Sequence, residues 1–223
     1  MMRKEELVTG EIYHVMNKSI AGFKIFHTQS DYERMLDMIR FFSMQGPLPK
    51  FSKFRSRAGV LKKGFAPHLA EFAVGQKQLV QIDSYCLMPT HFHLMVKQLE
   101  DEGISSFMSN LLNTYARYFN TKRKRKGPLW VGRYKAVHVT SDEQATHLTR
   151  YIHLNPTTAN LVKKPQHWSY SSYAEFVEPK SVDYPMCNFE GLIPMSSREY
   201  RSFVEDEIAY QKELGIIKHL VLE

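Results

Sequence analysis

Residues 79 to 97 read LVQIDSYCLMPTHFHLMVK, and this stretch decides the fold class. Leu79 to Leu87 and His91 to Lys97 are apolar runs of strand length. Met88-Pro89-Thr90 separates the two runs. A short turn between two strands implies an antiparallel pair. The stretch therefore predicts part of an antiparallel sheet.

Segments on both sides extend this pair into a larger pattern. Apolar residues recur at the helical period in two segments, and two further segments read as strands. The expected strands are 12–18 and 136–140. One expected helix runs through 32–42 and is capped by Ser30 or Asp31, and the other is 104–121. The order of these elements predicts an α+β fold. We expect a ferredoxin-like or RRM-like antiparallel sheet with helices on one face.

Two more helices are expected towards the C-terminus. Ser141 to Gln144 matches a capping box, which predicts a helix start. That helix must end near Asn155, because Pro156 follows. A helix over 197–214 would form a C-terminal helical tail.

His91 and His93 lie two residues apart on a predicted strand, so both imidazoles share one face. Tyr151 and Asn155 lie four apart on a predicted helix and flank its apolar stripe. Two imidazoles and an amide oxygen can hold one divalent ion, and a tyrosine hydroxyl beside it can act as a nucleophile. Asp83 and His14 are alternative third ligands, and Asn155 is favoured if its helix packs on the sheet.

Other candidates have simpler structural interpretations. Tyr115 and Tyr118 lie on the apolar side of their helix, which indicates core packing. His153 lies opposite the apolar stripe, which predicts an exposed or DNA-facing side chain. His14 is expected to be a strand residue with a local partner.

Charge is distributed unevenly along the chain. The net charge is +7, yet residues 175–223 carry −5, so residues 1–174 carry +12. Residues 50–63 and 103–141 contain no Asp or Glu. Such basic segments favour a nucleic-acid backbone as partner. The basic residues of the second segment are Arg117, Lys122, Arg123, Lys124, Arg125, Lys126, Arg133 and Lys135.

Composition narrows the protein class. Two cysteines without C-x-x-C spacing suggest neither a disulfide framework nor a cysteine zinc site, and a cytoplasmic location fits best. No signal peptide or membrane span is apparent, so no membrane partner is expected. We expect one domain over 1–177, with a basic insertion at 46–78 that includes a short helix near 68–74. An acidic, partly helical extension over 178–223 would follow.

The sequence also resembles the single-tyrosine HUH transposases, especially the branch associated with repetitive extragenic palindromes. Five blocks, spread over about residues 10 to 176, carry the resemblance in the right order. They are Tyr13-His14-Val15, residues 85–94 (YCLMPTHFHL), residues 115–120 (YARYFN), residues 127–135 (GPLWVGRYK) and residues 151–156 (YIHLNP).

The resemblance implies a metal-dependent single-strand DNA endonuclease and strand transferase that forms a 5′-phosphotyrosine. It implies that His91 and His93 are metal ligands, that Tyr151 is the nucleophile and that Asn155 supplies the third ligand. The cofactor would be Mg²⁺ or Mn²⁺. The partner would be single-stranded or hairpin DNA, bound by a monomer or homodimer. The eight basic residues would contact phosphates, and Trp130 or Tyr134 would stack on a base.

Two other classes remain open from the sequence. A non-catalytic nucleic-acid-binding module of RRM-like fold would need aromatic residues on an exposed sheet face. A zinc hydrolase would need a carboxylate base beside His91 and His93, and the sequence offers no convincing one.

Overall fold

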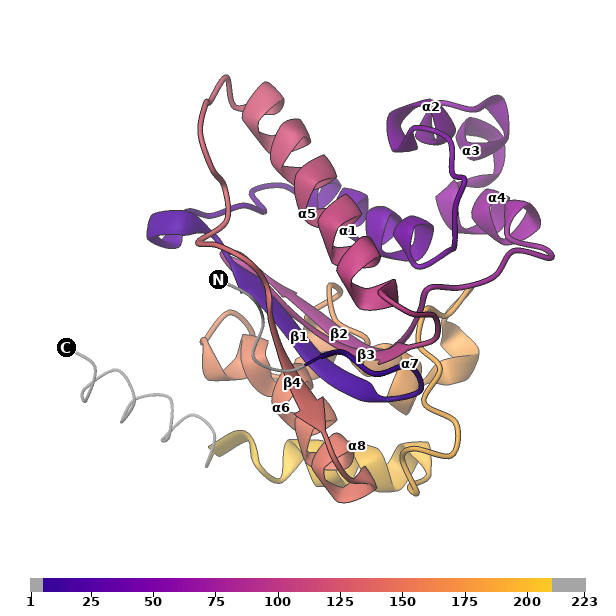
Figure 1. Ribbon diagram of the computed structural model, residues 1–223. Helices are drawn as coiled ribbons and strands as arrows, with labels where there is room; N and C mark the ends of the chain where they lie inside the picture. Colours follow the sequence, from indigo (N-terminus) through magenta and orange to yellow (C-terminus); the bar gives the residue numbers. More distant parts are fainter. Residues whose placement is uncertain (1–5, 210–223) are drawn as a thin grey trace.

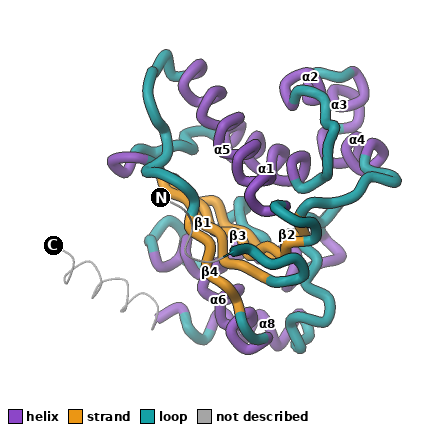
Figure 2. Tube along the Cα trace, in the orientation of Figure 1, coloured by secondary structure: helices purple, strands orange, loops and turns teal. Residues whose placement is uncertain are grey.

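The computed structural model describes residues 6–209 and contains one four-stranded antiparallel sheet (Figures 1 and 2). The strand order is β2-β3-β1-β4, with every neighbouring pair antiparallel. This order and the α+β pattern confirm the expected fold class. The strands are β1 (Ile12–Lys18), β2 (Val80–Met88), β3 (His91–Gln98) and β4 (Lys135–Val139).

Helices cover both faces of the sheet (Figure 1). The expected face carries α1 (Gln29–Phe42) and α5 (Gly103–Lys122), which pack on alternate residues of β3 such as Phe92. The opposite face carries α6 (Asp142–Thr158), whose Ile152 packs with Met95 of β3. Since side chains alternate along a strand, His91 and His93 lie on the α6 face with Met95.

The insertion at 46–78 is more helical than the sequence predicts. Its helices are α2 (Phe51–Arg55), α3 (Ala58–Lys63) and α4 (Phe65–Phe72), of which only the last was expected. The two unexpected helices are too short to show a helical period. Contacts among aromatic rings join α2 to α1 and to α4; these rings are Phe41, Phe51, Phe54, Phe65 and Phe72.

The expected end of α6 near Asn155 is wrong, because the helix continues through Pro156 to Thr158. Proline lacks an N–H and normally interrupts a helix. Here Leu154 and Pro156 are both buried, so packing offsets the missing hydrogen bond. The start of the helix agrees with expectation: the Ser141 hydroxyl accepts from the Gln144 backbone N–H at 3.1 Å.

The expectation that His153 is exposed is also wrong. Its side chain is fully buried, between α6 and the segment that follows it. Its Nδ1 lies 2.7 Å from the Tyr200 hydroxyl, and its Nε2 lies 2.8 Å from the Ser172 hydroxyl. The helical period predicted that the His153 side of α6 faces solvent, but the C-terminal segment covers that side.

The C-terminal segment is attached to the sheet domain by buried polar groups. Glu175 accepts a hydrogen bond from the Tyr85 hydroxyl of β2 at 3.3 Å, and others from the backbone N–H groups of Met186 and Cys187 at 2.8 and 2.7 Å. The helices of the C-terminal segment are η2 (Pro165–His167), α7 (Tyr173–Val177), η3 (Pro179–Ser181) and α8 (Ser197–Glu205). A further short helix, η1 (Ile20–Gly22), follows β1. The helix expected over 197–214 thus ends at Glu205, and 210–214 lie outside the described residues. The domain boundary at residue 177 stays a prediction. Among residues 6–209, no helix combines the length and apolar character needed to cross a membrane.

We expect His153 to make folding stability fall in acid. Burial lowers the pKa of His153 to about 3, so the folded state resists protonation while the unfolded chain protonates near pH 6.5. Stability is therefore lost as pH falls below about 6.5, by about 2 kcal/mol between pH 7 and 5. Urea unfolding of wild type and His153→Gln at both pH values measures this effect.

The comparison between the two proteins is essential. Burial raises the pKa of Asp83 to about 7, which changes stability in the opposite direction over the same range, and burial lowers the pKa of His14 to about 4. Both groups remain in His153→Gln. The difference in stability between pH 7 and 5 should therefore be about 2 kcal/mol smaller in the variant. An identical difference in both proteins would contradict the assignment to His153.

Candidate active site

Three histidines meet on the α6 face of the sheet. In the β1–β3 pairing, Met16 lies opposite His93 and Lys18 opposite His91, which brings the neighbouring His14 beside His93. His14 Nε2 lies 2.9 Å from His93 Nδ1. The rings of His91 and His93 lie edge to face, with centroids 5.1 Å apart. The local partner expected for His14 is thus a predicted metal ligand.

These imidazoles are held in the neutral form. Burial, assisted by Lys18, lowers the pKa of His91. Burial, assisted by His91 and His14, lowers the pKa of His93 well below its usual value. Neutral imidazole is the form that binds a metal ion. The electrostatics of the site therefore suit two nitrogen ligands near neutral pH.

Tyr151 of α6 lies against this cluster. Its ring stands edge-on to His93, with centroids 5.5 Å apart, and to His14 at 6.2 Å. Burial raises the pKa of the Tyr151 hydroxyl, while a hydrogen bond from the Asn155 side chain acts to lower it. With 38% of its surface exposed, Tyr151 is buried enough to be positioned and open enough to meet a substrate.

Asn155 lies next to Tyr151 as expected for an i+4 neighbour. Its side-chain nitrogen donates to the Tyr151 main-chain carbonyl at 2.8 Å, which leaves the amide oxygen for another partner. Asn155 does not line the cavity beside the histidines. Its convergence with His91 and His93 on one ion stays a prediction. Within residues 6–209, no group of three His, Cys, Asp or Glu side chains is arranged as metal ligands.

A cavity of about 390 Å³ opens beside these residues. Its walls bring His91, His93 and Tyr151 together with two of the predicted phosphate-binding residues, Arg133 and Lys135. The β1 residues Met16, Asn17 and Lys18 also line it, and the sequence did not single them out. Their signal was the even spacing of His14, Met16 and Lys18, which becomes informative only once β1 is paired with β3.

The rival tyrosines have structural roles. Tyr115 is fully buried, and its hydroxyl donates to the Ile25 carbonyl at 2.7 Å. Tyr118 is half-buried, and its hydroxyl donates to Asp31 at 2.7 Å. Neither residue lines the cavity beside the histidines.

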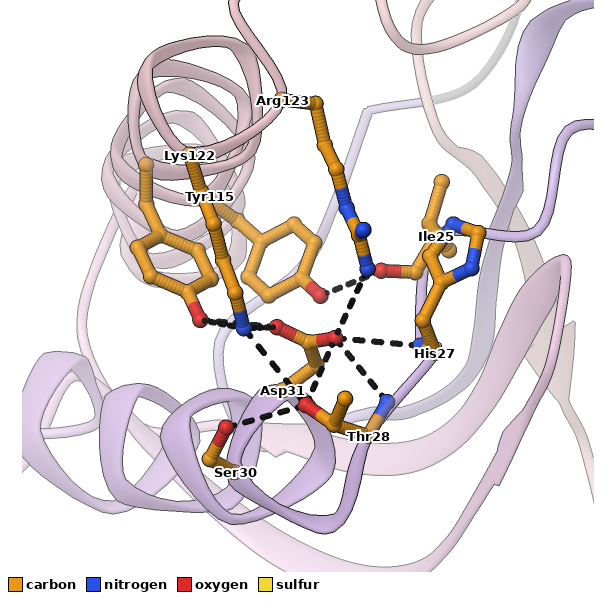
Figure 3. Close-up of polar contacts among 9 residues, drawn as sticks. Ile25, His27, Thr28, Ser30, Asp31, Tyr115, Lys122 and Arg123 are labelled. Carbon is orange, nitrogen blue, oxygen red and sulfur yellow. Dashed lines mark hydrogen bonds and ion pairs between the residues drawn. The ribbon is translucent and has the colours of Figure 1, made fainter.

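A carboxylate from α1 partly neutralises the basic run at 122–126. Asp31, 1% exposed, accepts from Lys122 and lies 3.8 Å from Arg123 (Figure 3). Burial opposes ionisation, but hydrogen bonds from Lys122, Tyr118 and the nearby backbone hold the pKa of Asp31 well below its usual value. Lys122 and Arg123 therefore have a carboxylate partner from a distant segment, although residues 103–141 themselves contain no Asp or Glu. Thr28 caps α1 with Asp31 as its capping-box partner, which corrects the predicted cap.

Two further predicted DNA contacts have roles within the fold. Arg125 donates to the Asn120 side chain at 3.1 Å and to the Pro128 carbonyl at 2.7 Å, which holds the turn after α5. The Trp130 indole N–H donates to the Leu112 carbonyl at 3.0 Å, and its ring packs on Phe92. This packing does not favour base stacking by Trp130. Exposed cations of the run remain at Lys124 and Lys126.

Comparison with known proteins gives one family match and two similar solved structures. Residues 53–155 match the family model of IS200-like transposases. A REP-associated tyrosine transposase, solved bound to a REP hairpin, has a similar structure with a TM-score of 0.53 at 14% identity, covering 88% of this chain and 96% of that chain. A protein described as a transposase from Deinococcus radiodurans R1 aligns with a TM-score of 0.36 at 15% identity, covering 68% of this chain and 95% of the other. Curated proteins give no match.

The family match over residues 53–155 agrees with the resemblance expected from the sequence, and the similar REP-associated structure agrees with its fold.

Proposed function

We propose that this protein is a DNA transposase and endonuclease of the HUH tyrosine type, which cuts single-stranded DNA by forming a covalent 5′-phosphotyrosine at Tyr151. The observation that carries the proposal is the contact of Tyr151 with His93 in a cavity that also holds Arg133 and Lys135. The Tyr151 oxygen attacks phosphorus and loses its proton to solvent. The P–O bond to the 3′-oxygen breaks, and this oxygen takes a proton from solvent and leaves as a 3′-hydroxyl. Because the new bond is also a phosphate ester, a second 3′-hydroxyl can reverse the step and join another strand.

The donor set supports a divalent cation at this site. Thr90 Oγ1 lies 3.0 Å from His91 Nδ1, and His14 lies beside His93 Nδ1, so the Nε2 atom of each imidazole remains for a ligand bond. His91, His93 and Asn155 would hold Mg²⁺ or Mn²⁺, and the amide oxygen of Asn155 is the kind of ligand that both ions prefer. A bound cation would supply Lewis-acid polarisation of the scissile phosphate.

The proposed substrate is single-stranded DNA or the flank of a DNA hairpin. The similar REP-associated transposase was solved with a REP hairpin, which supports this choice. In the cavity, Lys18 and Lys135 are exposed cations that suit phosphate oxygens. The test is a denaturing gel of protein incubated with labelled oligonucleotides and Mg²⁺ or Mn²⁺. We expect a covalent adduct between the protein and the 5′-phosphate end of the downstream fragment, and no adduct with either ion would overturn the proposal.

The alternative classes receive less support. A non-catalytic RRM-like module needs an open sheet face, whereas helices pack on both faces of this sheet. A zinc hydrolase needs a carboxylate base, and no Asp or Glu is among the residues that line the cavity in the described chain.

We predict that His14 positions His93 for metal binding. His93 Nε2 can bind a cation only if the proton of that ring lies on Nδ1, and His14 Nε2 is placed to accept it. His14→Ala should therefore weaken metal affinity by roughly 10–100-fold, while DNA affinity in EDTA is unchanged. Titration of cleavage rate with Mn²⁺ measures the shift. Equal Mn²⁺ midpoints for wild type and His14→Ala would contradict the prediction.

A further inference from the structure

A groove of about 920 Å³ lies away from the catalytic cavity, on the α1–α5 side of the sheet. One wall is α5, and the other is α1 with the start of the insertion. We name it the Arg34 groove, after a residue of α1 that lines it. It shares no lining residue with the cavity of Tyr151. Its charged lining residues are all basic: Arg34, Lys50, Arg117 and Lys122.

Arg34 is a half-buried cation without a carboxylate partner in the described chain. Its guanidinium carbon lies 4.2 Å from the Tyr118 ring centroid and 5.3 Å from that of Phe51. Its Nε is buried and has no hydrogen-bond partner among residues 6–209. Asp37, one turn further along α1, pairs with Arg55 at 3.0 Å instead. Burial, assisted by Arg55, lowers the pKa of Arg34, so its charge is held at a cost in free energy.

The neighbouring cations are also available to an anion. Arg117 is exposed and donates only a local bond of 3.4 Å to the Asn113 carbonyl. Lys50 is exposed, with no ion pair within the described residues. Lys122 differs, because Asp31 already neutralises it. Three cations without an ion pair in the described chain thus line one groove that has no acidic lining residue.

We propose that the Arg34 groove binds the phosphodiester backbone of a second stretch of the single-stranded DNA substrate, away from the scissile phosphate. The inference rests on the proposed function in taking DNA as the partner. The faces of Tyr118 and Phe51 that flank the groove are occupied by Arg34, so the groove offers guanidinium and ammonium groups to phosphates and no open ring to a base. Binding there should therefore be independent of base sequence.

The test is a salt titration of oligonucleotide binding in EDTA, on full-length protein carrying Tyr151→Phe. Under these conditions neither a metal ion nor a covalent adduct contributes, so the result does not depend on the proposed chemistry. Loss of two phosphate contacts in Arg34→Gln/Arg117→Gln should flatten the slope of log affinity against log salt by about 1.4. At 0.1 M salt this corresponds to roughly 25-fold weaker binding, for every sequence tested.

Arg57→Gln is the matched control. Arg57 is also an arginine stacked on two rings, Phe54 at 4.7 Å and Phe72 at 5.4 Å, but it lies outside the groove. Its substitution should leave the slope close to the wild-type value. Arg117→Gln alone guards against misfolding, because this side chain is exposed, and it should flatten the slope by about 0.7. In the Tyr151 enzyme, the double variant should raise KM for cleavage with kcat unchanged.

Three results would overturn the inference. One is an unchanged slope in both Arg117→Gln and the double variant. Another is an effect of Arg57→Gln as large as that of the double variant, which would indicate a diffuse basic surface. The third concerns competition by small anions. If inorganic phosphate or dTMP competes at the same concentration as unlabelled oligonucleotide, with the oligonucleotide counted as nucleotides, the groove is a small-anion site.

Discussion

Tyr151→Phe should abolish the covalent protein–DNA adduct and reduce strand cleavage by at least about a thousandfold. The substitution removes the proposed nucleophilic oxygen and keeps the ring that contacts His93. DNA affinity and thermal stability should stay close to the wild-type values, because 38% of the side chain is exposed and its ring is retained. Adduct formation is measured on denaturing gels, and affinity by fluorescence anisotropy.

Tyr115→Phe is the matched control for this experiment. The Tyr115 hydroxyl is buried and donates to the Ile25 carbonyl, so its loss should reduce stability by about 1–3 kcal/mol and leave the adduct intact. If Tyr115→Phe lost the adduct while retaining its fold, and Tyr151→Phe kept it, the nucleophile would be assigned to the wrong helix.

Replacing either predicted metal ligand should have an effect of similar size. His91→Ala and His93→Ala each remove one nitrogen from the proposed cation site, and loss of Lewis-acid stabilisation worth several kcal/mol slows cleavage on the order of a thousandfold. EDTA should abolish cleavage by the wild type, and excess Mg²⁺ or Mn²⁺ should restore it. Single-turnover cleavage rates measure both effects, and anisotropy in EDTA should show that DNA binding persists.

His138→Ala provides the control for the histidine variants. His138 lies on β4 of the same sheet, pairs with Glu11 at 2.8 Å and does not line the cavity. It should cleave at the wild-type rate. Cleavage that survives EDTA but is lost in His93→Ala would show that the imidazole acts in proton transfer and would refute the metal site.

The sequence predicted the candidate site best where local spacing determines geometry. The i, i+2 spacing of His91 and His93 placed both on one face of β3, and the i, i+4 spacing joined Tyr151 to Asn155. These relations need only the period of one strand or one helix. The fold class followed from the succession of strands and helices along the chain.

Sequence patterns were least informative where distant segments meet. His153 lies opposite the apolar stripe of α6, yet Ser172 and Tyr200 bury it from the far side. Lys122 and Arg123 have no acidic neighbours in sequence, yet Asp31 meets them across the α1–α5 contact (Figure 3). Neither pairing follows a local period, so no motif marked it.

The sequence by itself determined the antiparallel sheet, the paired histidines, the tyrosine helix and the basic character of the chain. Three features became visible only in the folded protein. His14 and Lys18 lie at the site, Pro156 lies inside a helix, and some cations have no ion pair in the described chain. The physical reason is that strand and helix periods are properties of neighbouring residues, whereas burial and charge neutralisation depend on every element that packs against a side chain.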